Sequence, residues 1–317
     1  MAKKHDIIWL DSIDSTNEEA KRHISDIDNL SVLSAYEQTE GRGQRGNTWT
    51  STPGENLMFS IVLKFSDMSA DGGSVVLPPL PARDQFVLNE IASLSVADFL
   101  SQHGISARIK WPNDIYVGSK KICGILIENS LRGSGISSSI IGIGLNINQR
   151  NFDVNLPNPT SMALCRQDLN CHSVSPECYS DSSQYHSDSS QCHSERSEES
   201  FDIRTCLEEF MDIFTSYYNR YLAAGGDFSS LRQQYLENLW RLDIQAEYID
   251  YTSLPSGHLD APVNICTDFD GTAETQNKPR CFHGIIRGLS DIGNLMVEDL
   301  TTGQLREFAF KEIGYIL

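Results

Sequence analysis

The chain has 317 residues, of which 39% are hydrophobic, and 25 Lys and Arg against 43 Asp and Glu give a net charge of −18. This length predicts two domains, and the apolar content excludes a chain that is disordered throughout. The negative charge opposes a nucleic-acid backbone, so we expect no DNA binding. No apolar run is long enough to span a membrane, and no signal-peptide pattern follows Met1. The scattered cysteines contain no C-x-x-C pair, which indicates free thiols in a cytoplasmic protein.

Short strands and helices alternate in the first half of the chain. We expect helices at about 15–24 and 86–103, and strands at 7–10, 31–37, 57–65, 108–111, 115–117, 122–128 and 140–148. Ser15 with Glu18, or Thr16 with Glu19, fits a capping box that opens the first helix. Residues 67–83 are interpreted as a loop. Because hairpins are frequent and no strict β-α-β repeat occurs, the class predicted is α+β, with a mixed sheet and flanking helices.

Residues 170–200 differ in composition from the rest of the chain. They are rich in Ser, and the segment 180–186 is repeated at 187–193. Few of these side chains can be buried, so we interpret the segment as a low-complexity, disordered insertion. Zinc binding is a minor alternative, because the segment also holds Cys171, His172, Cys178, His186, Cys192 and His193. Their spacing matches no standard zinc finger.

The C-terminal part begins with two expected helices, at 203–223 and about 230–238. From Trp240 onward the pattern changes to short strands separated by turns, at 244–250, 263–268, 281–287, 294–299 and 305–310. So many short strands in so few residues predict a small β-barrel. We therefore divide the chain into domains 1–239 and 240–317.

A glycine-rich segment, Gly41-Arg42-Gly43-Gln44-Arg45-Gly46, follows the second expected strand. It matches the dinucleotide-binding fingerprint formally, but the residues that follow are β-branched and interrupted by Pro53. They predict no helix to receive a pyrophosphate. Two interpretations remain, a loop that binds a phosphate or other anion through backbone N–H groups and arginines, and a hairpin connection with solvated arginines.

Other polar residues also allow both a structural and a functional interpretation. The segment 110–114, Lys-Trp-Pro-Asn-Asp, is typical of a tight turn after a strand. Lys121 precedes the apolar strand 122–127 and is either a solvated hairpin end or an ammonium placed beside a ligand carboxylate. Ser15, Thr16 and Asn17 are explained by helix capping alone, whereas Gln38 has no evident structural reason to be glutamine.

Taken together, five motifs resemble those of the biotin protein ligases, and they occur in the family's order. They are Asp14-Ser15-Thr16-Asn17, Gln38 with the glycine-rich segment to Trp49, Lys110–Asp114, Lys121–Glu128 and Gly142–Asn146. The resemblance covers about residues 7–165, with weaker support from the C-terminal domain. It implies a catalytic domain like that of class II aminoacyl-tRNA synthetases and lipoate ligases, followed by an SH3-like barrel.

The resemblance also implies a reaction in two steps. ATP and biotin would react to biotinyl-5′-AMP, with Mg²⁺ on the phosphates. A lysine of the biotin carboxyl carrier domain of a biotin-dependent carboxylase would then receive the biotin. A lipoate-type ligase and a non-catalytic sensor of biotin or its adenylate are the alternatives.

The resemblance further implies site residues. The catalytic residues would be Lys121 and Arg42, and no metal ligand is assigned. Biotin would be bound by Ser15, Thr16, Asn17, Gln38, Arg42, Gly43, Gln44, Lys121 and Gly124. The nucleotide would be bound by Arg42, Arg45, Trp49, Lys110, Asn113, Asp114 and Asn146.

The chain departs from the family pattern in two places. Gln44 stands where the family commonly carries arginine, and the 170–200 insertion interrupts the catalytic domain. We expect the monofunctional form, without the winged helix-turn-helix of the repressor members, and the sequence leaves a homodimer open.

Overall fold

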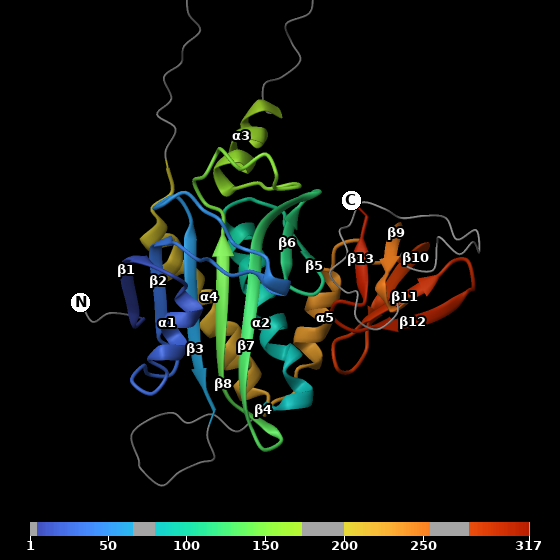
Figure 1. Cartoon of the computed structure of the whole chain (residues 1–317), viewed down its shortest axis with the longest axis horizontal. Coiled ribbons are helices and arrows are strands. Elements are labelled where there is room, and N and C mark those ends of the chain that lie inside the picture. The colour runs from blue at the N-terminus through green and yellow to red at the C-terminus, as the bar shows by residue number, and fades with distance from the viewer. Residues whose placement is uncertain (1–4, 66–79, 173–199, 254–278, 317) are drawn as a thin grey trace, which may run out of the picture.

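The computed structural model describes residues 5–65, 80–172, 200–253 and 279–316. Figure 1 shows two β-sheets side by side, a large one in the first part of the chain and a small one at its C-terminal end. Among the described residues, no helix is long and apolar enough to cross a membrane.

The large sheet has the strand order β1-β2-β3-β8-β7-β6-β5, with β4 paired to β8. Only the first pair, β1 and β2, is parallel, and the other pairs are antiparallel. The predicted mixed sheet is therefore confirmed. Its strands are β1 (Ile7–Ile13), β2 (Val32–Gln38), β3 (Leu57–Lys64), β4 (Leu80–Pro81), β5 (Arg108–Lys110), β6 (Asp114–Val117), β7 (Lys120–Arg132) and β8 (Gly135–Leu145).

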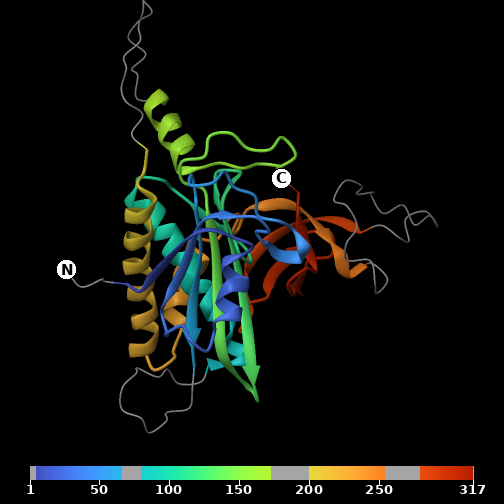
Figure 2. The same ribbon diagram turned by 60° about the vertical axis from the view of Figure 1, so that its left-hand side comes forward.

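Helices cover both faces of this sheet. The helices α2 (Phe86–Gln102) and α4 (Ile203–Ala223) lie on one face, with α5 (Ser229–Glu237) beside α2, and α1 (Thr16–Arg22) lies on the opposite face (Figure 2). On the side of α4, Phe210 and Phe99 pack edge-on against their aromatic neighbours. On the side of α1, a smaller apolar cluster contains Ala20, Leu33, Val62 and Ile140. Apolar burial on both faces explains why the central strand β3 is apolar along nearly its whole length.

The C-terminal strands form a separate antiparallel sheet in the order β12-β11-β10-β9-β13. They are β9 (Gln245–Asp250), β10 (Arg280–Leu289), β11 (Leu295–Asp299), β12 (Gln304–Phe308) and β13 (Ile313–Tyr315). This confirms the predicted small β-domain. One apolar core runs from the large sheet into this domain and includes Leu239, Phe282, Val297 and Phe308. The boundary at residue 240 stays a prediction.

Several sequence-based expectations were wrong in detail. Ser15 occupies the N-cap position of α1 but forms no capping hydrogen bond with its side chain. The capping box fails because tertiary partners take its members: Thr16 bonds to Gln38, and Glu18 forms an ion pair with Arg42. Part of the expected loop 67–83 is ordered as β4 and as a 3₁₀ turn at Ala82–Asp84.

Two elements were missed. The helix α3 (Met162–His172) runs into the segment interpreted as an insertion, so that segment cannot begin at residue 170. The short strand β13 closes the edge of the C-terminal sheet beside β9. The expected strand 263–268, and the proposed disorder and zinc ligands from residue 173 onward, lie outside the described residues.

The cysteines follow the sequence-based expectation only in part. Cys123, Cys165 and Cys206 are buried thiols. Cys281, on β10, is disulfide-bonded, so the expectation of free thiols is wrong for this residue.

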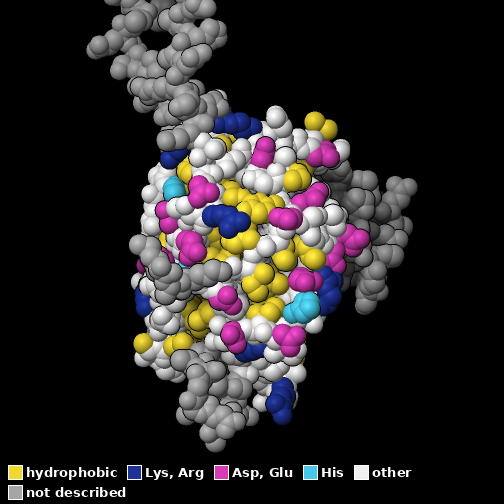
Figure 3. Space-filling view, turned by 90° about the vertical axis from the view of Figure 1, so that its left-hand side faces the viewer, with side chains coloured by type: hydrophobic (Ala, Val, Ile, Leu, Met, Phe, Trp, Pro, Cys, Tyr) yellow, Lys and Arg dark blue, Asp and Glu magenta, His cyan; other side chains and the backbone are white. Residues whose placement is uncertain are grey.

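The side of the molecule that carries β1 has a mixed surface (Figure 3). Apolar side chains gather there among scattered acidic and basic ones. Ile8 is 40% exposed, and Trp9 stacks on Tyr36 with ring centroids 5.2 Å apart, while the Arg204 guanidinium lies over both rings. The net negative charge of the chain therefore does not make this side uniformly acidic.

Candidate active site

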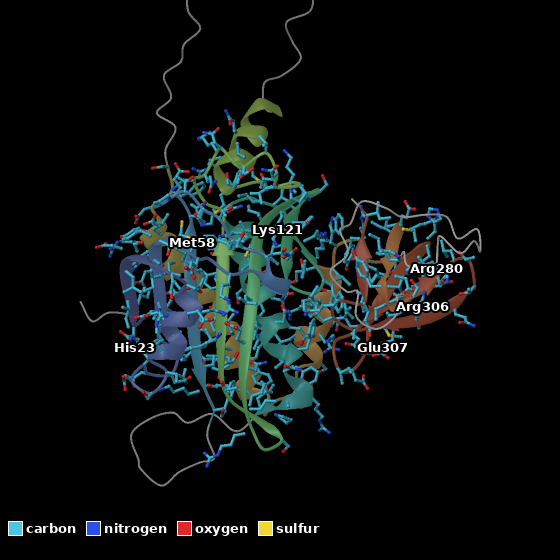
Figure 4. The ribbon with its side chains drawn as sticks, in the orientation of Figure 1. His23, Met58, Lys121, Arg280, Arg306 and Glu307 are labelled. Atoms are coloured by element: carbon cyan, nitrogen blue, oxygen red, sulfur yellow. The ribbon has the colours of Figure 1, made fainter. Side chains whose placement is uncertain are left out.

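A pocket lies on the α1 side of the large sheet, above β7 and β8. All nine residues predicted to bind biotin line it, and they come from the start of α1, the end of β2, the glycine-rich segment and β7. Lys121 projects from β7 in the upper half of the large sheet, far from Arg280 and Arg306 of the C-terminal sheet (Figure 4). The fold thus brings together residues that are separated by more than one hundred positions in the sequence.

The glycine-rich segment forms a small hairpin over this pocket. The Gly43 N–H donates to Asn47 O at 2.7 Å, and the Trp49 N–H donates to Gly41 O at 2.9 Å. At Gly41, a Cβ atom would lie 2.3 Å from Trp49 O, so glycine is required for this close approach. The segment ends in a 3₁₀ turn, Gln44–Gly46, where a dinucleotide-binding fingerprint would open an α-helix. This agrees with the rejection of that fingerprint. The side chain of Arg45 is outside the described part of the structure.

The indole of Trp49 lies against the backbone of two paired glycines, Gly124 of β7 and Gly144 of β8. A Cβ atom at Gly144 would approach Trp49 Cε2 to 2.4 Å, and one at Gly124 would approach Trp49 Cζ3 to 3.1 Å. Within the described structure, the Trp49 Nε1–H is buried without a hydrogen-bond partner. The ring therefore forms one wall of the pocket, and its only polar group is left unsatisfied.

The floor of the pocket is a connected set of polar side chains. The Thr16 N–H donates to Gln38 Oε1 at 2.8 Å, which ties α1 to the end of β2. The hydroxyl of Ser60, on β3, lies 2.8 Å from Thr16 Oγ1 and 2.6 Å from Asn17 Oδ1. Thr16, Asn17 and Ser60 are almost completely buried, so their mutual hydrogen bonds offset the cost of removing them from water.

Two cations lie at the rim of the pocket. Lys121 Nζ is 2.7 Å from Asp114 Oδ1, and its side chain is 33% exposed. Arg42 forms an ion pair with Glu18 and lies 3.5 Å from Glu128 Oε1. Both predicted catalytic cations are thus balanced by carboxylates of the protein.

Five of the residues predicted to bind the nucleotide lie around two neighbouring cavities: Trp49, Lys110, Asn113, Asp114 and Asn146. Both cavities share Trp49 and Lys121 with the first pocket, which Arg42 also lines. Asn146 borders one, and Asn113 borders the other. Both asparagines also brace the backbone, since Asn113 Nδ2 donates to Ile125 O at 2.7 Å and Asn146 Nδ2 donates to Thr160 O at 2.9 Å. These positions agree with a site that continues from the first pocket past Lys121.

Lys110 lies on the side of the site that faces the C-terminal domain. Its Nζ is 4.6 Å from the ring centroid of Tyr116 and 5.0 Å from that of Tyr315, and it donates to the Tyr116 hydroxyl at 3.0 Å. Burial is the main cause that lowers the pKa of Lys110 to about 8. Lys110 borders the second cavity but not the first pocket.

Sequence reasoning missed several residues of this site. Gly142 and Gly144 line the pocket, and Ser60 and Glu128 bond to its floor. Gly142, Gly144 and Glu128 belong to motifs that carry the resemblance, so the sequence could have identified them as site residues. Ser60 lies inside an apolar strand, where no pattern distinguishes it.

No group of three or more His, Cys, Asp or Glu side chains in the described ranges could hold a metal ion. Asp114 is the one carboxylate in the predicted site set, and Lys121 occupies it at 2.7 Å. A Mg²⁺ ion held mainly by ATP phosphates needs only one or two protein carboxylates, so Asp114 fits that limited role.

Comparison with known proteins agrees with this geometry. The family model for the biotin/lipoate A/B protein ligase family matches residues 9–146, which hold the pocket and its floor. The matched residues include every predicted biotin-binding residue, from Ser15 to Gly124.

Curated relatives of this chain carry ligase names. The chain is 32% identical over 149 residues to the bifunctional ligase/repressor BirA of Bacillus spizizenii, which covers 46% of this chain and 42% of the relative. It is 34% identical over 137 residues to the biotin–[acetyl-CoA-carboxylase] ligase of Paracoccus denitrificans, which covers 42% of this chain and 51% of the relative. The matches thus span about half or less of these relatives' lengths.

Solved structures extend the likeness in fold to the C-terminal domain. The biotin protein ligase of Aquifex aeolicus in complex with biotin and ATP has a TM-score of 0.62 at 20% identity and covers 98% of both chains. The biotin protein ligase of Leishmania major in complex with biotinyl-5-AMP has a TM-score of 0.51 at 19% identity, and covers 96% of this chain and 98% of that one. At these identities the likeness establishes the fold, α+β with a separate C-terminal β-domain.

Proposed function

We propose that this protein is an ATP-dependent biotin protein ligase, which activates biotin as biotinyl-5′-AMP and transfers it to a lysine of a biotin carboxyl carrier domain. The observation that carries the proposal is the convergence of the nine predicted biotin-contact residues on one pocket within the residues that match the family model. The names of the relatives, which include biotin–[acetyl-CoA-carboxylase] ligase, support the same substrate. A cytoplasmic location would agree with this role, and the net charge of −18 argues against DNA as a partner.

The chemistry of the pocket suits biotin. Biotin combines a ureido ring, which needs both donors and acceptors, with an apolar ring and chain that end in a carboxylate. The buried residues Ser15, Thr16 and Asn17, with the half-buried Gln38, offer hydroxyl and amide groups for the ureido ring. Gly124 and Gly144 leave room above the sheet, and Lys121 at the rim can receive the carboxylate.

In the first step, a carboxylate oxygen of biotin would attack the α-phosphorus of ATP, and the bond to the bridging oxygen would break to release pyrophosphate. Two anions approach each other, so cations that stabilise the crowded charge lower the barrier. Lys121 and Arg42 are the described candidates for this role. Asp114 holds Lys121 at the junction of the pocket and its neighbouring cavities. Mg²⁺ would neutralise charge on the ATP phosphates, with Asp114 as the residue available to hold it.

In the second step, the neutral amine of the carrier lysine would attack the acyl carbon of the mixed anhydride, and AMP would leave. Water competes with the amine for the same carbon, so the site must exclude it. The hairpin of the glycine-rich segment and the indole of Trp49 lie over the pocket and can cover the adenylate. The C-terminal domain borders the second cavity through Tyr251 and Tyr315, which leaves a shared surface for a protein partner.

Release of pyrophosphate from ATP tests this proposal. We expect release when biotin is added and none when lipoate is added, followed by labelling of a carrier domain with biotin. Equal release with lipoate would assign the alternative of a lipoate-type ligase. Binding of biotin without any pyrophosphate release would identify a non-catalytic sensor and contradict the proposal.

A further inference from the structure

Glu128 is a half-buried carboxylate that lies next to the pocket without lining it. Alternate residues of a strand share one face, and on β7 the pocket is lined by Gly124 and Leu126, so Glu128 is the next residue on that face. Its side chain is 24% exposed. Its Oε2 accepts from Asn17 Nδ2 at 2.8 Å, and its Oε1 accepts from Lys21 Nζ at 2.7 Å. Glu128 therefore bonds to Asn17, a residue of the pocket, without lining the pocket itself.

The contacts of Asn17 determine which way its amide is turned. A side-chain amide presents an NH₂ donor on one side and a carbonyl acceptor on the other, and only its partners distinguish the two orientations. The NH₂ group of Asn17 faces the Glu128 carboxylate and, at 3.4 Å, the carbonyl oxygen of Leu126. Burial opposes ionisation of Glu128, but hydrogen bonds from Lys21 and Asn17 outweigh it and lower its pKa. At neutral pH, Glu128 is thus an acceptor only.

The orientation of Asn17 determines which of the other floor residues donate hydrogen bonds and which accept them. Asn17 Oδ1 can only accept, so Ser60, 2.6 Å away, must donate its single proton there. In the 2.8 Å contact between Ser60 Oγ and Thr16 Oγ1, Thr16 is then the donor, rather than donating to Gln38 Oε1 at 3.2 Å. Thr16 keeps an acceptor lone pair for a ligand. Gln38 Oε1 is occupied by the Thr16 N–H, so Gln38 keeps its NH₂ group as a donor.

We infer that Glu128 is a positioning residue of the biotin site, which sets the donor and acceptor pattern of the pocket floor through Asn17, Ser60 and Thr16. The inference rests on the proposed function, because the pattern matters for a cyclic urea with N–H donors and a carbonyl acceptor. Space for the amide comes from Gly142, where a Cβ atom would lie 2.3 Å from Asn17 Oδ1. With a neutral residue at position 128, Asn17, Ser60 and Thr16 can all exchange their donor and acceptor roles.

Glu128→Gln tests the inference by calorimetric titration with biotin and by steady-state kinetics. Glutamine has nearly the same shape but can also donate, so it no longer imposes one orientation on Asn17. We expect the biotin dissociation constant to rise at least about tenfold, while kcat at saturating biotin stays within about threefold. The comparison variant is Glu18→Gln, which removes the other carboxylate near Lys21 and Arg42 but keeps the Asn17 bond. Its biotin affinity should stay within about threefold of the wild type.

Ser60→Ala provides a second, independent test, because Asn17 bonds to Ser60 through its Oδ1 and to Glu128 through its Nδ2 and so links the two. Losses of biotin affinity from Glu128→Gln and Ser60→Ala should be clearly non-additive in the double variant, whereas those from Glu18→Gln and Ser60→Ala should add. If Glu128→Gln does not fold, as judged by its melting temperature, an unchanged affinity in Ser60→Ala overturns the inference.

Other outcomes would also overturn the inference. Wild-type affinity in folded Glu128→Gln would mean that Asn17 is oriented without Glu128. Equal losses in Glu128→Gln and Glu18→Gln would mean that the charge around Arg42, not the orientation of Asn17, is responsible. A wild-type protein that binds no biotin would overturn both the proposed function and the inference. The outcomes in the variants, by contrast, overturn the inference alone.

Discussion

Lys121 is held in place by its backbone while its ammonium remains accessible. Its N–H donates to Asn158 O at 2.7 Å, its carbonyl oxygen accepts from Thr160 N at 2.9 Å, and Asp114 contacts its Nζ at 2.7 Å. A fixed backbone and an accessible charge suit a lysine that changes partner when an anion binds. Lys120, its neighbour, is exposed.

Lys121→Ala should abolish most adenylate formation while the fold persists. Loss of one charge that stabilises a transition state lowers the rate by 10²–10³, roughly 3–4 kcal/mol. A partly exposed ion pair contributes little to folding, so the melting temperature should change little. The measurement is biotin-dependent pyrophosphate release, with Lys120→Ala as the matched control. A near-normal rate in folded Lys121→Ala protein would rule out the catalytic role.

Gln44 lies in the wall of the pocket, and its Nε2 donates to Ile125 O at 3.4 Å. An arginine at this position adds a planar cation that can bond a phosphate, and charge-assisted hydrogen bonds are about twice as strong as neutral ones. We expect Gln44→Arg to slow dissociation of preformed biotinyl-adenylate and to leave carrier biotinylation intact. The dissociation rates of the two proteins are compared at one salt concentration. An equal or faster rate in Gln44→Arg would mean that this position does not contact the adenylate.

At the scale of elements, Arg232 of α5 joins three parts of the fold. Its guanidinium forms an ion pair with Glu90 of α2 and donates to Ser290 O, in the β10–β11 turn, at 2.7 Å. In the same turn, Gly293 O accepts from Trp111 Nε1 at 2.9 Å. Trp111 stands three residues before Asp114, so the docking of the C-terminal sheet supports the turn that leads into the site.

Arg232→Met should destabilise the protein by about 3–5 kcal/mol at pH 8, because it leaves the buried Glu90 carboxylate without a partner. Burial, the largest cause, already raises the pKa of Glu90 to about 7 despite Arg232. A carboxyl with a raised pKa stabilises the folded state at low pH, and this contribution is lost as the pH rises through that pKa. The penalty of Arg232→Met should therefore be smaller at pH 6, where Glu90 is protonated.

Urea unfolding at both pH values measures this effect, with Glu90→Gln/Arg232→Met as the matched control. The double variant has no buried charge to compensate, so it should be more stable than Arg232→Met at pH 8 and should show less dependence on pH. A penalty that does not change between pH 6 and pH 8 would contradict an ionised, unpaired Glu90 as its cause.

At the scale of the whole molecule, the two sheets share one apolar core, and residues 238–240 also join them. The Ile109 N–H donates to Asn238 O at 2.8 Å, and the Trp240 N–H donates to Ile109 O at 2.7 Å. The segment between α5 and β9 thus lies along the edge strand β5. The two domains predicted from composition are packed as one body, although their sheets are separate.

Deleting residues 173–199 and joining the ends with a short Gly-Ser linker should leave the melting temperature and the ligase rate nearly unchanged. The segment is Ser-rich with few apolar residues, and the entropy of a loop changes slowly with its length. Both flanking helices, α3 and α4, are kept. If chelators lower the melting temperature of the intact protein but not of the deletion protein, the segment binds a metal and the prediction is wrong.

Strongly periodic elements could be predicted because burial imposes the pattern locally. The helix α4 buries Phe210, Phe214 and Tyr218 at helical spacing, and β3 is apolar along one continuous run, so both were expected close to their observed bounds. The hairpin of β6 and β7 followed from its turn residues. Short elements such as β4 and β13 could not be predicted, because each has only two or three residues and exists through pairing with a strand distant in sequence.

The sequence by itself determined the fold class, the C-terminal β-domain and the order of the motifs, because these depend on residues close together in the chain. Only the tertiary structure decided what each polar residue bonds to. Ser15 and Glu18 have the spacing of a capping box, yet Ser15 caps nothing with its side chain, and Glu18 pairs with Lys21 and Arg42. Ser60 and Glu128 belong to the pocket floor only because β3, β7 and α1 meet there. Hydrogen bonds between distant segments depend on where the fold places both partners, and local spacing does not contain that information.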